Sequence, residues 1–129
     1  MATTYEERQP PFITPGYLFN ADPTCRVIDG RFYVFTSHDQ VTEQFQGPED
    51  FWNNMMDYRA LSTTDFAHWV DHGSILNIHD AGWAAGQALW DGDAGVPGPD
   101  GRFYAYLPFR HERGFAIGVL VADRPEGPY

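Results

Sequence analysis

Two aspartates, Asp22 and Asp93, have the spacing in this sequence that best suits acid–base chemistry. Each lies seven residues before an Asp-Gly pair, which begins at Asp29 in one case and at Asp100 in the other. In isolation both would be ordinary turn residues, because Asp before Pro and Asp beside Gly are common in loops. Their equal spacing instead places them at matching points of a repeat. Two carboxylates that converge on one pocket from such points would suit acid–base hydrolysis.

Two other groups of reactive side chains do not form a convincing site. Ser37, His38 and Asp39 are consecutive, but neighbours on a strand point to opposite faces and cannot converge as a catalytic triad. His68 and His72 would share a face only on a helix, whereas their segment has the character of a turn leading into a strand. We interpret both histidines as surface residues.

An internal repeat organises the chain. The sequence Asp-Gly-Arg-Phe-Tyr-Val-Phe at residues 29–35 returns as Asp-Gly-Arg-Phe-Tyr-Ala-Tyr at residues 100–106. The Asp-Gly pair supplies the positive φ of a tight turn, and the aromatic run that follows has strand propensity. Each copy therefore predicts a β-hairpin in which the repeated residues form the turn and the second strand. Asp22 and Asp93 belong to the equivalent first strands.

Further strands predict an all-β fold with two similar units. Residues 58–62 follow the first copy and residues 116–121 follow the second, and no stretch has a convincing helical period. A unit of three or four antiparallel strands thus occurs twice, over approximately residues 22–76 and 88–129. Repeated units of this kind are typical of the blades of a β-propeller. Since two blades leave apolar faces and open edges uncovered, we expect the chain to be part of a longer protein.

The charge balance disfavours nucleic acid and anionic membranes as partners. The 129 residues suffice for one domain. Eighteen acidic side chains against eight basic ones give a net charge of -10, which repels phosphate backbones and anionic lipid headgroups. All eight basic residues are arginine, so a Schiff-base lysine and a P-loop lysine are excluded. A neutral ligand is the expected partner.

The sequence also suggests a compartment. Residues 1–12 contain glutamates and paired prolines without the apolar stretch of a secretory signal, and the longest apolar run, residues 115–122, is too short to cross a bilayer. The single cysteine, Cys25, cannot form an internal disulfide, which agrees with a reducing compartment. We therefore expect a cytoplasmic protein, although a start codon assigned too far downstream would hide a leader.

The sequence resembles the N-terminal part of glycoside hydrolase family 43, a family of five-bladed β-propellers. The matching stretches keep the family's order and cover nearly the whole chain. They are residues 17–23, 29–39, 61–73, 83–93 and 117–129. The resemblance implies a single propeller catalytic domain, of which residues 1–129 supply about the first two blades. It also implies inverting hydrolysis of pentose glycosides such as xylo-oligosaccharide ends or arabinofuranosyl side chains.

The resemblance assigns roles to both aspartates. The family's Ala-Asp-Pro aspartate falls on Asp22 and implies the general base that activates water. The family's Trp-x-x-Asp aspartate falls on Asp93 and implies a residue that orients the general acid and raises its pKa. This motif departs from the common Ala-Pro pair, since it contains Asp91 and Gly92. The family's general-acid glutamate has no match; Glu126 lies in a turn that we expect to be exposed, so the isolated chain is predicted to be inactive.

The remaining candidates would contact substrate. Aromatic residues make up 16% of the chain, and aromatic rings pack well against sugars. Trp83 and Trp90 could form the walls of the first sugar subsite, or they could pack between blades. His38 and Asp39, at the end of a strand, could reach the channel mouth, and Asp57 lies in a predicted loop that could cap the pocket.

No cofactor or metal ligand is assigned from the sequence. The run at residues 91–95 lacks the sixth-position glycine and the terminal glutamate of an EF-hand loop. A structural calcium in the axial channel of a complete propeller stays open, as does the choice between xylosidase and arabinofuranosidase. The expected partner is a small carbohydrate or an oligosaccharide. A propeller that binds glycans without catalysis, or an inactive fragment, is the alternative hypothesis.

Overall fold

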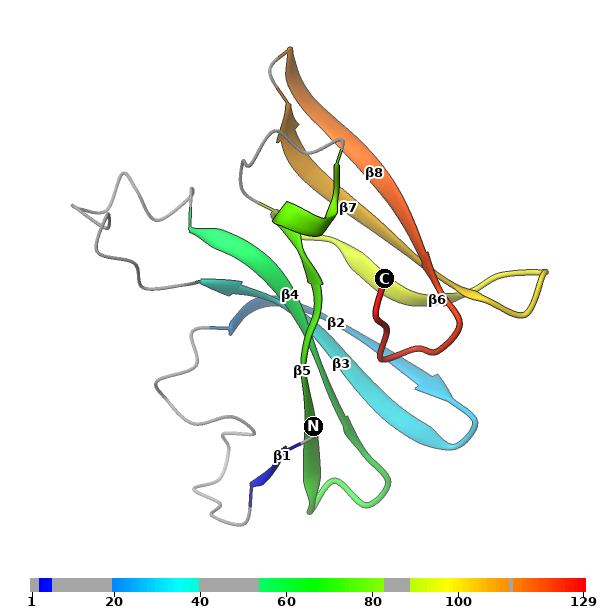
Figure 1. Cartoon of the computed structure of the whole chain (residues 1–129). Helices are drawn as coiled ribbons and strands as arrows, with labels where there is room; N and C mark the ends of the chain where they lie inside the picture. The colour runs from blue at the N-terminus through cyan, green and yellow to red at the C-terminus, as the bar shows by residue number, and fades with distance from the viewer. Residues whose placement is uncertain (1–2, 6–19, 40–53, 83–88, 112) are drawn as a thin grey trace.

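The computed structural model has an all-β fold, as the sequence predicts. It describes residues 3–5, 20–39, 54–82, 89–111 and 113–129, which form two antiparallel sheets (Figure 1). Sheet A has the strand order β1-β5-β4-β3-β2, and sheet B has the order β6-β7-β8. The strands are β1 (Thr3–Tyr5), β2 (Asn20–Ile28), β3 (Arg31–Asp39), β4 (Met55–Thr63), β5 (Trp69–Asn77), β6 (Asp93–Pro97), β7 (Phe103–His111) and β8 (Gly114–Ala122).

Both Asp-Gly pairs close β-hairpins, which confirms the prediction from the repeat. In the hairpin of β2 and β3, Asp29 and Gly30 have φ angles of 49° and 76°. In the hairpin of β6 and β7, Gly101 has a φ angle of 77°. Glycine adopts this left-handed region without strain, and aspartate tolerates it better than most residues. Both turns therefore use the freedom of their glycine, but the second turn is longer, and in it the backbone N–H of Gly101 donates to the carbonyl oxygen of Gly98 at 3.2 Å.

Asp65 holds the turn between β4 and β5. Its Oδ1 accepts hydrogen bonds from two backbone N–H groups of the turn at 2.7 and 2.8 Å, and its Oδ2 lies 2.6 Å from Nδ1 of His68. The His68 side chain and then these N–H groups lower the pKa of Asp65. Strand β5 follows this turn, and the short 3-10 helix η2 (Ile78–Asp80) comes directly after β5. Among the described residues, no helix is long and apolar enough to span a membrane.

The two histidines differ in exposure. His68 is exposed, as expected, whereas His72 is only partly exposed. Its Nε2 lies 2.8 Å from Oγ of Ser62 on the neighbouring strand, and its ring stacks on Tyr33. Burial lowers the pKa of His72. The expectation failed because these partners come from β3 and β4, which are distant in sequence.

The core lies between the two sheets. Tyr33 and Phe35 of β3 belong to the same buried cluster as Ala105 and Leu107 of β7. Gly95 of β6 has a φ angle of 67° and lies against Phe35, where an added Cβ would come within 2.4 Å of a ring atom. The sheets are therefore in close contact here. This contact brings β2 and β6 together. Strand β2 begins at Asn20, and strand β6 begins at Asp93.

Each sheet also has an apolar outer face. On sheet A, Val34, Leu61 and Trp69 form a second buried cluster beside a hollow of about 340 Å³. On sheet B, four alternating residues of β8 are exposed, because the side chains of a strand alternate between faces. They are Phe115, Ile117, Val119 and Val121, with exposed fractions of 79%, 70%, 55% and 39%.

Candidate functional site

A β-bulge at the start of β2 sets the direction of the Asp22 side chain. The pairing of β2 with β3 shifts by one residue between Ala21 and Thr24, and Asp22 has a φ angle of 51°. A bulge of this kind bends the strand and redirects a side chain. The following Pro23 cannot donate a ladder hydrogen bond and also disfavours right-handed helical backbone at Asp22. The local sequence Ala-Asp-Pro thus accounts for the irregularity that exposes the carboxyl group.

The Asp22 carboxyl group has one hydroxyl and one carboxyl partner. Oγ of Ser37 on β3 lies 3.4 Å from Oδ2 of Asp22 and 3.2 Å from the carbonyl oxygen of Ala21. Asp91, in the turn before β6, hydrogen-bonds the Asp22 side chain. This bond, then burial and then the charge of Asp91 raise the pKa of Asp22, Ser37 opposes the rise, and the charge of Asp39 adds to it. Asp22 therefore holds its proton more strongly than an ordinary aspartate.

Tyr58 holds the turn that carries Asp91. Its hydroxyl donates to the carbonyl oxygen of Trp90 at 2.9 Å and accepts from the backbone N–H of Gly92. A Cβ at Gly92 would lie 2.1 Å from Cδ2 of Leu107, so this position has room only for glycine. Because the Tyr58 hydroxyl is fully buried and bonded on both sides, the turn is firmly positioned.

Burial and three carboxyl groups affect the pKa of Tyr58. Burial raises this pKa most, and Asp91, Asp22 and Asp93 each raise it further, while the N–H of Gly92 lowers it. Asp22 on β2 and Asp93 on β6 belong to strands of different sheets that are in contact with each other.

Asp93 is held by an ion pair. Its Oδ2 contacts Nη2 of Arg26 on β2, and Nε of the same guanidinium donates to the carbonyl oxygen of Ala94 at 3.0 Å. The other oxygen, Oδ1, is buried and has no hydrogen-bond partner among the described residues. Arg26 thus fixes the orientation of Asp93 across the boundary between β2 and β6.

The carboxyl group that bonds Asp22 is Asp91, a residue that the sequence did not single out for a role. The only signal for it was the departure of the motif from the Ala-Pro pair at residues 91 and 92. This effect of Asp91 on Asp22 could not be inferred from the motif, because the two residues are 69 positions apart in the chain.

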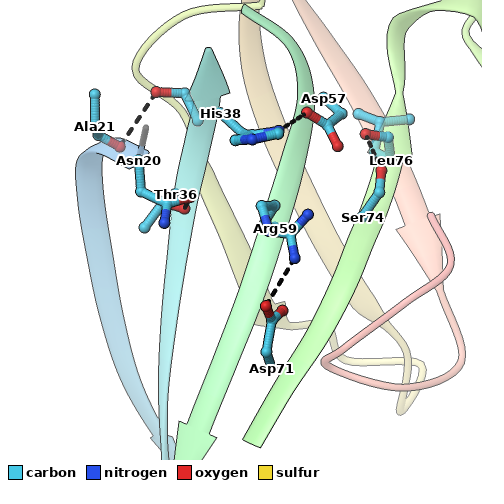
Figure 2. A network of polar contacts seen from close by, with 10 residues as sticks. Asn20, Ala21, Thr36, His38, Asp57, Arg59, Asp71, Ser74 and Leu76 are labelled. Atoms are coloured by element: carbon cyan, nitrogen blue, oxygen red, sulfur yellow. Dashed lines mark hydrogen bonds and ion pairs between the residues drawn. The ribbon is translucent and has the colours of Figure 1, made fainter. Parts of the chain in front are cut away.

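His38 and Asp57 form a pair on two neighbouring strands of sheet A. Nδ1 of His38 lies 2.6 Å from Oδ1 of Asp57, and Figure 2 shows the two side chains pointing toward one another. Asp57 lies within β4 and is 3% exposed, so the prediction that it belongs to a capping loop is wrong. The cross-strand pairing of His38 with Asp57 accounts for its position.

His38 points away from the Asp22 carboxyl group. Its neighbour Ser37 contacts Asp22, and consecutive residues on a strand face opposite sides of the sheet. Asp39 has an exposed fraction of 8%, and burial raises its pKa. Its charge also acts on Asp22. Of the three candidates at residues 38, 39 and 57, Asp39 is thus one whose charge affects the pKa of Asp22.

The aromatic candidates have different outcomes. Trp83 lies outside the described residues. The Trp90 ring packs on Phe115 of β8, with ring centroids 5.3 Å apart. Trp90 therefore packs against strand β8, and its role in a sugar subsite stays a prediction.

Glu126 is less exposed than the sequence suggested. It is partly buried, and its side chain hydrogen-bonds the hydroxyl of Tyr33, which helps to raise the pKa of that tyrosine after burial. The turn after β8 folds back toward sheet A, where the backbone N–H of Tyr129 donates to the carbonyl oxygen of Ile75 at 2.9 Å. This contact explains the burial. Within the part of the chain that the structure describes, no group of three His, Cys, Asp or Glu side chains could hold a metal ion.

Sequence relatives and solved structures agree on one family. A xylosidase/arabinosidase from Humicola insolens is 39% identical over 117 residues, which cover 87% of this chain and 35% of the relative. A xylosidase/arabinosidase from Bacteroides ovatus is 37% identical over 121 residues, which cover 92% of this chain and 36% of the relative. A family 43 glycoside hydrolase from Xanthomonas citri, solved with xylotriose, superposes with a TM-score of 0.73 at 35% identity, over 88% of this chain and 32% of the other. The chain belongs to glycoside hydrolase family 43.

The match to family 43 covers only part of the family's length. A family 43 β-xylosidase/α-arabinofuranosidase from a compost metagenome, also solved with xylotriose, gives a TM-score of 0.71 at 38% identity over 87% of this chain and 34% of the other. The chain thus spans about a third of the length of the curated relatives that it matches. It matches no protein-family model.

Proposed function

We propose that this family 43 chain is part of an inverting glycoside hydrolase that cleaves pentose glycosides, with Asp22 as the general base. The observation that carries the proposal is the Asp22 carboxyl group itself. A bulge and a left-handed backbone turn it out of β2, and Ser37 supports one of its oxygens. An exposed carboxyl group at the boundary of two sheets can reach both a water molecule and a bound sugar.

In the proposed reaction, Asp22 removes a proton from water as the water attacks the anomeric carbon. Inversion requires a general acid on the other side of the scissile bond, with the two carboxyl groups about 6.5 to 9.5 Å apart so that the water fits between them. The glutamate that serves as acid in the family has no match in these residues. Asp93 takes the part of the residue that orients this acid, and its ion pair with Arg26 supports that role by fixing the carboxylate.

The same proposal accounts for the apolar outer faces. Sheet A, over about residues 22–76, and sheet B, over about residues 88–129, are taken as the first two blades of a five-bladed propeller. The apolar row of β8 would then pack against a following blade. The hollow beside Trp69 on sheet A would pack against the blade that closes the ring. Exposed apolar areas of this kind indicate contact surfaces in a larger assembly.

The substrate class rests on the relatives. The curated relatives from Humicola insolens and Bacteroides ovatus are both described as xylosidase/arabinosidase, and two structural neighbours were solved with xylotriose. We take xylo-oligosaccharide ends and arabinofuranosyl side chains as the substrates. Both sugars are neutral, which suits a chain with a net charge of -10.

The test is hydrolysis of aryl β-xyloside and aryl α-arabinofuranoside by the full-length protein that contains this chain. Asp22→Asn should lower kcat by about 10²- to 10⁴-fold, the range expected for the loss of a general base. Asp29→Asn is the matched control, because it makes the same chemical change at an exposed turn with a similar φ angle. Its turnover should equal that of the wild type.

Two outcomes would contradict the proposal. Unchanged turnover in Asp22→Asn would remove Asp22 as the base. Binding of xylotriose by the wild type without hydrolysis of any pentoside would favour a glycan-binding propeller. The anomer of the first product, measured by proton NMR, tests inversion separately.

A further inference from the structure

Strand β6 contains a β-bulge directly after Asp93. The pairing of β6 with β7 shifts by one residue between Asp93 and Val96, and Gly95 inside the bulge has a φ angle of 67°. A bulge removes backbone groups from the ladder of hydrogen bonds between strands, so these groups need partners from elsewhere. The direction of the Asp93 side chain therefore depends on what holds this bulge.

Two side chains from other elements hold the backbone of the bulge. The N–H of Gly95 donates to the Tyr129 hydroxyl at 2.9 Å. Nε of Arg26 donates to the carbonyl oxygen of Ala94 at 3.0 Å, and the same guanidinium contacts the Asp93 carboxylate. Because these groups belong to consecutive residues, a shift of the backbone at Gly95 would also disturb the ion pair of Asp93.

We propose that Tyr129 is a positioning residue for Asp93, which its hydroxyl keeps in place by anchoring the bulge at Gly95. On the other side of Asp93, the Tyr58 hydroxyl accepts the N–H of Gly92 in the same way. Asp93 thus lies between two backbone N–H groups that are each bonded to a tyrosine hydroxyl. The effect on catalysis rests on the proposed function of Asp93, whereas the anchoring of the bulge does not.

Tyr129 is itself held in place. Its backbone N–H donates to the carbonyl oxygen of Ile75 on β5 at 2.9 Å, and its hydroxyl donates to the carbonyl oxygen of Pro125 at 3.0 Å. Its ring packs against the buried core between the sheets. Burial raises the pKa of Tyr129 to about 12, so the hydroxyl keeps the proton that it donates. Because β5 belongs to sheet A and the bulge to sheet B, Tyr129 links the two sheets beside the bulge.

Tyr104 of β7 offers a matched comparison. Its hydroxyl donates to Oδ2 of Asp100 at 2.8 Å, in the exposed turn between β6 and β7. This bond involves no group of the bulge. Tyr104→Phe and Tyr129→Phe therefore make the same chemical change at two sites of sheet B, and only Tyr129→Phe removes the partner of Gly95.

The first experiment tests the anchoring alone. Hydrogen exchange of the Gly95 amide and of Arg26 Nε–H is measured by NMR in the full-length protein that contains this chain. Both groups should exchange faster in Tyr129→Phe, because Gly95 loses its acceptor and the loosened bulge carries the acceptor of Arg26. They should exchange in Tyr104→Phe as in the wild type. Unchanged exchange of Gly95 in Tyr129→Phe would overturn the inference.

The second experiment tests whether Tyr129 acts through Asp93. Hydrolysis of the aryl pentosides is measured for Tyr129→Phe, Asp93→Asn and the double variant. Tyr129→Phe keeps the ring in the core and should lower kcat by about 10-fold with little change in KM, because misplacement of groups by about 1 Å can cost about 10²-fold. In the Asp93→Asn background the same change should have no further effect. An equal loss in both backgrounds would overturn the positioning role, because Tyr129 would then act on the fold as a whole.

The outcomes separate the two proposals. Full activity in Asp93→Asn would overturn the proposed function of Asp93, and the exchange of Gly95 would still decide whether Tyr129 anchors the bulge. An unchanged kcat in Tyr129→Phe beside an impaired Asp93→Asn would overturn the positioning role alone. A loss of kcat in Tyr104→Phe as large as that in Tyr129→Phe would also overturn it, because the bulge would then have no special part in the effect.

Discussion

The hairpin of β2 and β3 and the hairpin of β6 and β7 begin from nearly the same seven residues but occupy different surroundings. Their turn glycines, Gly30 and Gly101, have φ angles of 76° and 77°. Phe35 of the first hairpin is 0% exposed, whereas its counterpart Tyr106 is 42% exposed. Phe35 points into the core between the sheets, and Tyr106 lies on the outer face of sheet B. Local sequence thus determines the turn, while burial depends on what packs against each face.

The comparison extends to the chemistry. Asp22 and Asp93 hold equivalent places, yet Asp22 faces a like charge, Asp91, while Asp93 faces the opposite charge of Arg26. Ser37 gives Asp22 a hydroxyl neighbour. The equivalent residue in the second hairpin is Pro108, whose side chain has no hydroxyl group. These different partners agree with the different roles proposed for the two residues. A base benefits from a tuned pKa, and an orienting carboxylate benefits from a fixed charge.

The largest expected difference between the hairpins is in stability. Phe35→Ala should lower the free energy of unfolding by about 3–5 kcal/mol, because it leaves a cavity in the core between the sheets. Tyr106→Ala should cost less than about 1 kcal/mol in the isolated chain, since the ring is partly in solvent. Urea denaturation measures both. Similar costs would show that the two strands are equally buried in solution.

The turns themselves should respond alike. Gly30→Ala and Gly101→Ala should each cost about 1–2 kcal/mol, because an L-residue is strained at a left-handed φ angle. An added Cβ meets nothing within 4 Å at either position, so strain is the main effect. Thermal unfolding of the two variants checks this. A difference of more than about 1 kcal/mol between them would break the equivalence of the turns.

A smaller effect is expected from the ion pair that distinguishes Asp93. Arg26 and Asp93 have side-chain exposed fractions of 29% and 42%, so solvent screens their attraction. A double-mutant cycle with Arg26→Gln and Asp93→Asn should give a coupling of less than about 1 kcal/mol in the free energy of unfolding. A much larger coupling would mean that the pair contributes to the fold and not only to the orientation of Asp93.

The smallest effect concerns the second turn alone. Asp100 accepts a hydrogen bond from Arg102 at 2.7 Å and one from the Tyr104 hydroxyl, and these lower the pKa of Asp100 to about 2. A depressed pKa means that this interaction is present above the ordinary aspartate range and is lost as the pH falls through about 2. Arg102→Gln should raise the pKa, as measured by NMR titration of Asp100.

The matched control for this variant is the equivalent arginine of the first hairpin. Nη1 of Arg31 donates to Oγ of Ser62 at 3.2 Å on the neighbouring strand. Arg31→Gln should therefore leave the titration of Asp100 as in the wild type. A shift of Asp100 in this control, or none in Arg102→Gln, would contradict the local origin of the effect.

The sequence by itself determined the elements and the approximate location of the site. The Asp-Gly pairs and the aromatic runs after them act over a few residues, so both hairpins and the all-β fold could be predicted. The equal spacing of Asp22 and Asp93 from their turns also placed them on equivalent strands. These features depend on local backbone preferences, which a short stretch of sequence contains.

Only the tertiary structure decided which side chains meet. The contact of Asp91 with Asp22, the position of Asp57 within β4 and the burial of His72 all depend on partners from other strands. The Tyr58 hydroxyl, for example, holds Gly92 across 34 residues of sequence. Local spacing does not encode such contacts, because they follow from the packing of one sheet against the other.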